Sequence, residues 1–159
     1  MAIGDSFPLE KRKAYVERNL KAWSVIYLYC ESISPPHDKF LLIVSASPYV
    51  LYFFINTEPY ELAKSNPKMK ETQVSIDVKE HPFLSYDSFI DCSRLLSLPT
   101  YEVERQLVAD VGRVKGVISD AIQAKVLEAV RKNGVMSPRK KKMILEQLLR
   151  KTPRRGGRA

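Results

Sequence analysis

The first half of the chain alternates apolar runs with short polar breaks. Residues 9–21 space their apolar side chains among Lys, Arg and Glu, which predicts a surface helix behind a flexible leader at 1–8. Three following runs are rich in β-branched and aromatic residues and predict strands. These strands are expected at 23–32, 40–45 and 49–56, with a proline-directed loop at 35–38 and a break at 46–48. The last two runs are almost continuously apolar, which predicts cover on both faces.

The middle of the chain is more polar. Residues 57–71 predict a long loop with one helical turn near 60–64, because prolines and polar residues dominate there. Apolar and polar positions alternate over 73–78, which predicts a half-buried strand, and 87–93 predict another.

Beyond Pro99 the apolar spacing becomes helical. Thr100 is expected to cap a first helix, and residues 119–131 form a second that Gly134 closes in a left-handed conformation. A last short helix is expected to begin at Ser137. Its apolar side is Met143, Ile144, Leu145, Leu148 and Leu149. Strands that precede helices predict an α+β fold.

Length and composition predict one domain. The 159 residues suit a single core, which we place at 9–136 before a basic helix and disordered tail at 137–159. There is no apolar stretch of about 18 residues, so no membrane span is predicted. Cys30 and Cys92 each lie in an apolar run and are expected to be buried free thiols. A signal peptide is not expected either, so the predicted location is cytoplasmic.

Charge is concentrated at the C-terminal end. Residues 137–159 hold nine of the 26 Lys and Arg and one of the 18 Asp and Glu, which leaves 17 of each sign before them. A basic segment of this kind attracts polyanions such as nucleic acid, or an acidic protein partner. The predicted nucleic-acid-binding residues are Arg139, Lys140, Lys141, Lys142, Arg150, Lys151, Arg154, Arg155 and Arg158.

Several enzyme classes are not supported by the motifs. Two histidines and two distant cysteines do not make a four-ligand metal site, and a glycine-rich phosphate loop is missing. We therefore expect no metal and no cofactor. His81, followed by proline, is expected to lie at a turn before a strand and not in a catalytic site.

Several segments of the chain, in their order, resemble one family. Residues 39–57 begin with a basic residue at a strand entrance and continue to a second strand that ends in threonine. Residues 87–95, 107–113 and 118–131 follow as a last strand, a glycine-containing turn and a helix. This order is similar to the PemK/MazF-like toxins (mRNA interferase-like) over about residues 24–133. The resemblance implies a small SH3-like bent β-barrel (CcdB/PemK/MazF-like) with an N-terminal helix and C-terminal helices. It also implies a homodimer, an antitoxin protein as partner and metal-free cleavage of single-stranded RNA.

The same resemblance implies a catalytic site. The family's strand-entrance arginine corresponds to Lys39, which lacks the bidentate fork of arginine, and its hydroxyl residue corresponds to Thr57. His37 lies two residues before Lys39 and could supply acid–base chemistry at neutral pH. The preceding loop departs from the family, because prolines replace its Gly- and Glu-containing sequence. In a purely structural alternative, Asp38 pairs with Lys39 and Thr57 caps the turn at a proline.

Two functions remain open from the sequence. The first is a toxin-like endoribonuclease that acts on RNA. The second is a non-catalytic member of the same fold whose basic tail binds RNA, DNA or an acidic partner. Four tyrosines could also stack bases on a sheet face, but aromatic residues in apolar strands are more often core or dimer contacts. These tyrosines are Tyr27, Tyr29, Tyr49 and Tyr52, and we do not assign them to the site.

Overall fold

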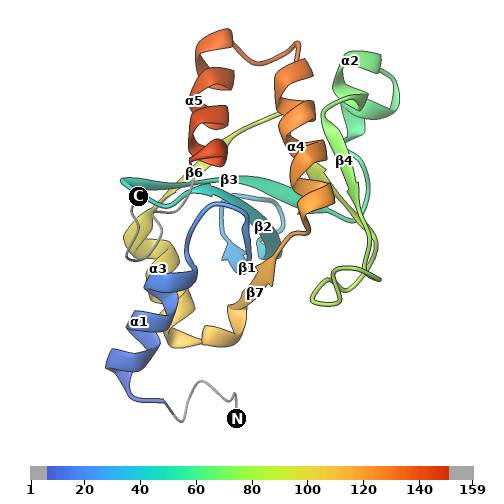
Figure 1. Ribbon diagram of the computed structural model, residues 1–159. Helices are drawn as coiled ribbons and strands as arrows, with labels where there is room; N and C mark the ends of the chain where they lie inside the picture. The colour runs from blue at the N-terminus through green and yellow to red at the C-terminus, as the bar shows by residue number, and fades with distance from the viewer. Residues whose placement is uncertain (1–6, 151–159) are drawn as a thin grey trace.

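The computed structural model describes residues 7–150. The predicted RNA-binding residues Lys151, Arg154, Arg155 and Arg158, and most of the leader, therefore lie outside the described residues. Within them, a seven-stranded antiparallel sheet carries helices on both sides (Figure 1). The helices are α1 Leu9–Asn19, η2 Glu61–Lys64, α2 Pro67–Lys70, α3 Thr100–Ala109, η3 Val111–Arg113, α4 Asp120–Lys132 and α5 Pro138–Leu149. The strands are β1 Ser24–Cys30, β2 His37–Ser45, β3 Tyr49–Asn56, β4 Gln73–Ile76, β5 Ser88–Asp91, β6 Leu96–Pro99 and β7 Val114–Val117.

The sheet is a curled half-barrel. Its strand order is β4-β5-β3-β2-β1-β7, and β6 also pairs with β3. Thus β3 has β2 along one side, while β5 pairs with its C-terminal end and β6 with its N-terminal half. The α+β class predicted from the sequence is confirmed, and the curled sheet is compatible with a bent barrel.

Two apolar cores form, one on each face of the sheet. On one face, Leu42 and Phe53 pack with residues of α4 and α5 such as Val126 and Ile144. On the other face, Leu41 packs with residues of α1 and α3. Successive residues of a strand point to opposite faces, so a strand covered on both sides must be apolar at every position. The predicted cover on both faces is confirmed.

Most predicted strands and helices are present, with local corrections. β2 begins at His37, inside the predicted loop, because its pairing with β1 extends to Cys30 opposite His37. The strands β6 and β7 were not predicted; each has four residues, too few for a clear period. Since β7 lies between α3 and α4, the strands do not all precede the helices.

Helix ends also differ from prediction. Pro99, not Thr100, is the N-cap of α3, and the Thr100 hydroxyl instead donates hydrogen bonds to the carbonyls of Ala46 and Pro48 at 2.8 and 2.9 Å. Gly134 is not left-handed: among the described glycines only Gly116 has a positive φ. The end of α4 is held instead by side-chain hydrogen bonds of the buried Asn133. The helices predicted to begin at Ser119 and Ser137 are present, and each of these serines is the N-cap of its helix, α4 and α5.

Candidate functional site: a cleft at the end of β2 and β3

Antiparallel pairing brings the start of β2 beside the end of β3. Phe40 lies opposite Ile55, so the residues just before Phe40 and just after Ile55 meet at one end of the strand pair. A cleft of about 370 Å³ opens there. Its lining residues come from β1, from both strand ends and from the loop before β5. They are Tyr27, His37, Asp38, Lys39, Phe40, Ile55, Asn56, Thr57, Glu58, Ser85 and Tyr86.

All three residues predicted as catalytic therefore border one cleft. Thr57 is exposed and follows the last residue of β3. His37 is also exposed, and its Nδ1 lies 2.7 Å from the carbonyl oxygen of Pro35. A carbonyl oxygen can only accept a hydrogen bond, so Nδ1 carries the proton in the neutral ring and Nε2 keeps its lone pair. His37 is thus in the tautomer that can accept a proton through Nε2.

Lys39 has a different environment. Its ammonium group donates a hydrogen bond to the Asn56 side-chain oxygen and lies 4.7 Å from the centre of the Phe54 ring. Burial lowers the pKa of Lys39 below its ordinary value, and the charge of Arg94 lowers it further, while Cys30 and Asp91 act in the opposite direction. The ammonium is therefore held by the residue directly before Thr57. It lies on the sheet face of Phe54, opposite the face on which Phe40 packs.

A second cation group lies beside Tyr27. Arg113 Nη1 donates to Asp38 Oδ1 at 2.8 Å and to the Tyr27 carbonyl at 3.0 Å. Asp38 thus pairs with Arg113, whereas the sequence alternative had it pairing with Lys39. Lys115 Nζ lies 5.6 Å from the centre of the Tyr27 ring, and the Arg113 guanidinium 5.9 Å. These two basic residues from η3 and β7 were missed by sequence reasoning, because neither stands in a basic run.

A network of hydrogen-bonded polar side chains also lies on the sheet face that carries Lys39. The carboxylate of the buried Asp91 accepts hydrogen bonds from Gln73 Nε2 at 2.8 Å and from the Ser93 hydroxyl and backbone amide. Gln73 in turn accepts from the backbone amide of Tyr60, whose ring lies 5.0 Å from the Arg94 guanidinium. These hydrogen bonds fix the connection between β5 and β6. Arg94, which lies in this connection, is exposed.

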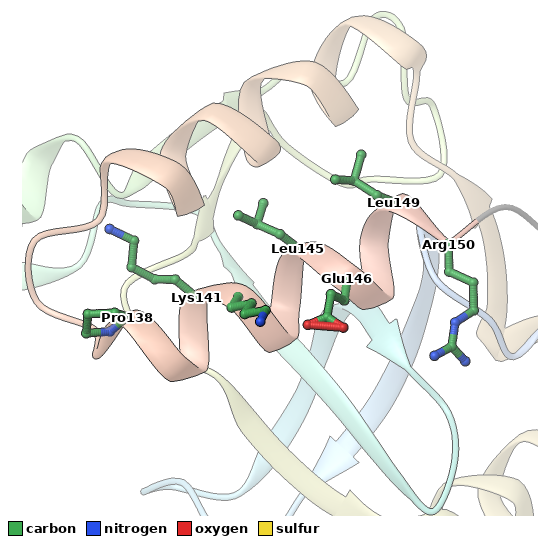
Figure 2. A pocket seen from close by; sticks show the side chains of 7 residues that line it. Pro138, Lys141, Leu145, Glu146, Leu149 and Arg150 are labelled. Atoms are coloured by element: carbon green, nitrogen blue, oxygen red, sulfur yellow. The ribbon is translucent and has the colours of Figure 1, made fainter.

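The basic residues of α5 and of its C-cap do not line the cleft. Lys141 donates to the Asn133 carbonyl at 2.8 Å, while the other four are exposed. They are Arg139, Lys140, Lys142 and Arg150. A groove of about 630 Å³ runs along α5. Figure 2 shows Leu145 and Leu149, two of its lining residues, projecting on the same side of the helix. Leu149, predicted on the apolar side of this helix, is 52% exposed.

The other candidate side chains have structural contacts. His81 is 1% exposed, and its Nε2 accepts a hydrogen bond from the Ser119 backbone amide at 3.0 Å. Tyr52 is buried at 3% exposure and cannot stack bases, while Tyr29 and Tyr49 are exposed. Cys30 and Cys92 are buried and free, as predicted.

Comparison with known proteins does not identify the chain. No protein-family model matches it, and no curated protein matches it in sequence. Within residues 7–150, no three His, Cys, Asp or Glu side chains gather in a way that could hold a metal ion. None of the helices in that part of the chain is both long and apolar enough to cross a bilayer.

Proposed function

We propose that the protein is a metal-free endoribonuclease that cleaves single-stranded RNA in the cleft at the end of β2 and β3. The observation that carries the proposal is that His37, Lys39 and Thr57 border the same cleft. They supply a proton acceptor, a cation and a hydroxyl donor, the groups that phosphodiester cleavage by the RNA's own 2′-hydroxyl requires. The nearby Lys115 adds positive charge for the phosphate.

In the proposed reaction, the 2′-oxygen of the RNA forms a bond to phosphorus and gives its proton to His37 Nε2. The bond from phosphorus to the 5′-oxygen breaks, and that oxygen takes a proton from water. In this reaction the Lys39 ammonium leaves Asn56 and turns into the cleft, where it and the Thr57 hydroxyl stabilise the negative charge on the phosphate oxygens in the transition state. The products are a 2′,3′-cyclic phosphate and a 5′-hydroxyl. DNA has no 2′-hydroxyl and would not be cleaved.

The test is cleavage of labelled single-stranded RNA by the purified protein in the presence of a chelator. Lys39→Met and Thr57→Ala should each reduce cleavage strongly, while Lys68→Met and Ser65→Ala, at exposed positions outside the cleft, should not. In cells, induced expression should stop growth, and the same two cleft variants should relieve the arrest. Cleavage that survives in both cleft variants would exclude this site.

A second candidate is a non-catalytic RNA-binding module of the same fold. It is favoured by the hydrogen bond from Lys39 to Asn56, which already engages the ammonium within the protein. In this case expression is harmless and RNA stays intact, but RNA binding is salt-sensitive and is lost when the exposed cations Arg139, Lys140, Lys142 and Arg150 are changed to Gln. The cleavage assay therefore separates the two candidates.

A further inference from the structure

A second groove lies between the β5–β6 connection and the turn that joins α4 to α5. It has a volume of about 440 Å³. Arg94 and Lys140 line it together with apolar residues that include Leu95, Val135 and Met136. No acidic residue lines it, and neither cation forms an ion pair with another residue in 7–150.

Both walls of this groove are fixed before any ligand arrives. Asn133 is buried; its side-chain amide donates to the Cys92 carbonyl at 3.0 Å, and its side-chain oxygen accepts from the backbone amides of Val135 and Met136. This joins the α4–α5 turn to the strand that leads to Arg94. The opposite wall is held because the Ser93 amide and hydroxyl both donate to Asp91. A rigid groove loses little conformational entropy on binding.

We propose that this groove is a second nucleotide subsite, in which Arg94 and Lys140 bind phosphates of a single-stranded RNA that also occupies the cleft. The inference rests on the proposed function. Two cations in a groove that no acidic residue lines suit a phosphate backbone, and the apolar side, where Val135 is 55% exposed, suits the face of an unstacked base. A duplex hides its base faces, so the groove favours a single strand.

A cation that lines the groove interacts electrostatically with a cation that lines the cleft. Lys39 borders the cleft, Arg94 borders the groove, and the charge of Arg94 contributes to the lowered pKa of Lys39. Lys140 belongs to α5, so the groove also leads to the other exposed cations of that helix. An RNA strand that leaves the cleft past Arg94 then reaches Lys140 through the groove that both cations line.

The test measures binding of 2′-O-methyl RNA, which the protein cannot cleave, by fluorescence anisotropy over a range of salt concentrations. Two single-stranded oligomers are compared, one of about 4 and one of about 12 nucleotides, because only the longer can fill both sites. The test variant is Arg94→Gln with Lys140→Gln. The control variant, Lys125→Gln with Arg131→Gln, changes net charge equally at exposed positions of α4.

For the longer RNA, the groove variant should bind more weakly, and the slope of log affinity against log salt should fall by about 0.7 for each lost phosphate contact. The shorter RNA should bind the groove variant and the wild-type protein with equal affinity. The control variant should show the wild-type salt slope with the longer RNA. Equal losses in the groove and control variants, or unchanged binding of the longer RNA, would overturn the subsite while leaving the cleft intact. Failure of wild type to bind either oligomer would reject the proposed function and the subsite with it.

Discussion

The ammonium group of Lys39 donates a hydrogen bond to the side-chain oxygen of Asn56, the last residue of β3. This contact sets where the cation lies at the cleft, one residue before Thr57. A hydrogen bond of this kind favours the charged form of the lysine, whereas burial lowers its pKa.

A double-mutant cycle tests this contact. Lys39→Met and Asn56→Ala should each lower the free energy of unfolding, and the two effects should be coupled by about 1 kcal/mol, because each change alone removes the same hydrogen bond. Urea unfolding of the four proteins measures the coupling. The pair Lys115→Met and Asn56→Ala serves as the uncoupled control, and additive effects for Lys39 and Asn56 would contradict the contact.

Substitution of His81 and substitution of His37 should have very different effects on the free energy of unfolding. His81→Phe leaves the backbone amide of Ser119 without the ring nitrogen that accepts its hydrogen bond beside a buried side chain, so the free energy of unfolding should fall by about 1–3 kcal/mol. His37→Phe, at an exposed position, should change stability little but abolish RNA cleavage. A stable His81→Phe protein would show that the amide at the start of α4 does not depend on this ring.

Neighbouring leucines of α5 provide a matched pair. Leu148 is 4% exposed within the core that joins α5 to the sheet, whereas the Leu149 side chain faces solvent. Leu148→Ala should cost about 2–5 kcal/mol because it leaves a cavity. Leu149→Ala should change the free energy of unfolding by less than about 0.5 kcal/mol. Chemical denaturation distinguishes the two, and similar losses would mean that α5 packs through a different side.

Stability should fall in alkaline solution, in part because of Tyr52. Burial raises the pKa of this phenol from 10.0 to about 12 in the folded protein. Between these pH values the folded state keeps a proton that the unfolded chain has lost, so the free energy of unfolding decreases as pH rises.

Tyr52→Phe should therefore flatten the dependence of stability on pH over this interval. The exposed Tyr101→Phe is the control and should follow the wild-type curve. Urea midpoints at a series of alkaline pH values provide the measurement. A wild-type slope in Tyr52→Phe would show that its phenol is hydrated in the folded state.

Local sequence pattern was sufficient for much of the fold. The strand from Tyr49 to Asn56 and the helix that Ser119 caps match their predicted bounds within a residue, because the strand is a continuous run of β-formers between polar breaks and the helix has a clear period. Continuous apolar runs also predicted the cover on both faces. Four-residue strands such as β6 and β7 have too little pattern to be found in this way.

The candidate site was predictable only in part. Lys39 and Thr57 were chosen through a resemblance, and pairing of β2 with β3 brings both to one cleft. Arg94 and Lys115 carried no local signal, since an isolated cation in the sequence has no pattern that distinguishes it from a surface residue. Their neighbours, Tyr60 and Tyr27, are distant in the chain and meet them only after the sheet has formed.

By itself, the sequence determined the succession of strands and helices, the basic C-terminal segment and the burial of both thiols. Tertiary structure alone decided which polar groups meet: His81 with Ser119, Asp38 with Arg113, and the indole of Trp23 with the carbonyl of Leu148. The reason is physical. Periodicity and capping act between near neighbours, whereas these hydrogen bonds join residues that are 38, 75 and 125 positions apart. Only packing of the two cores on the sheet brings such residues within contact.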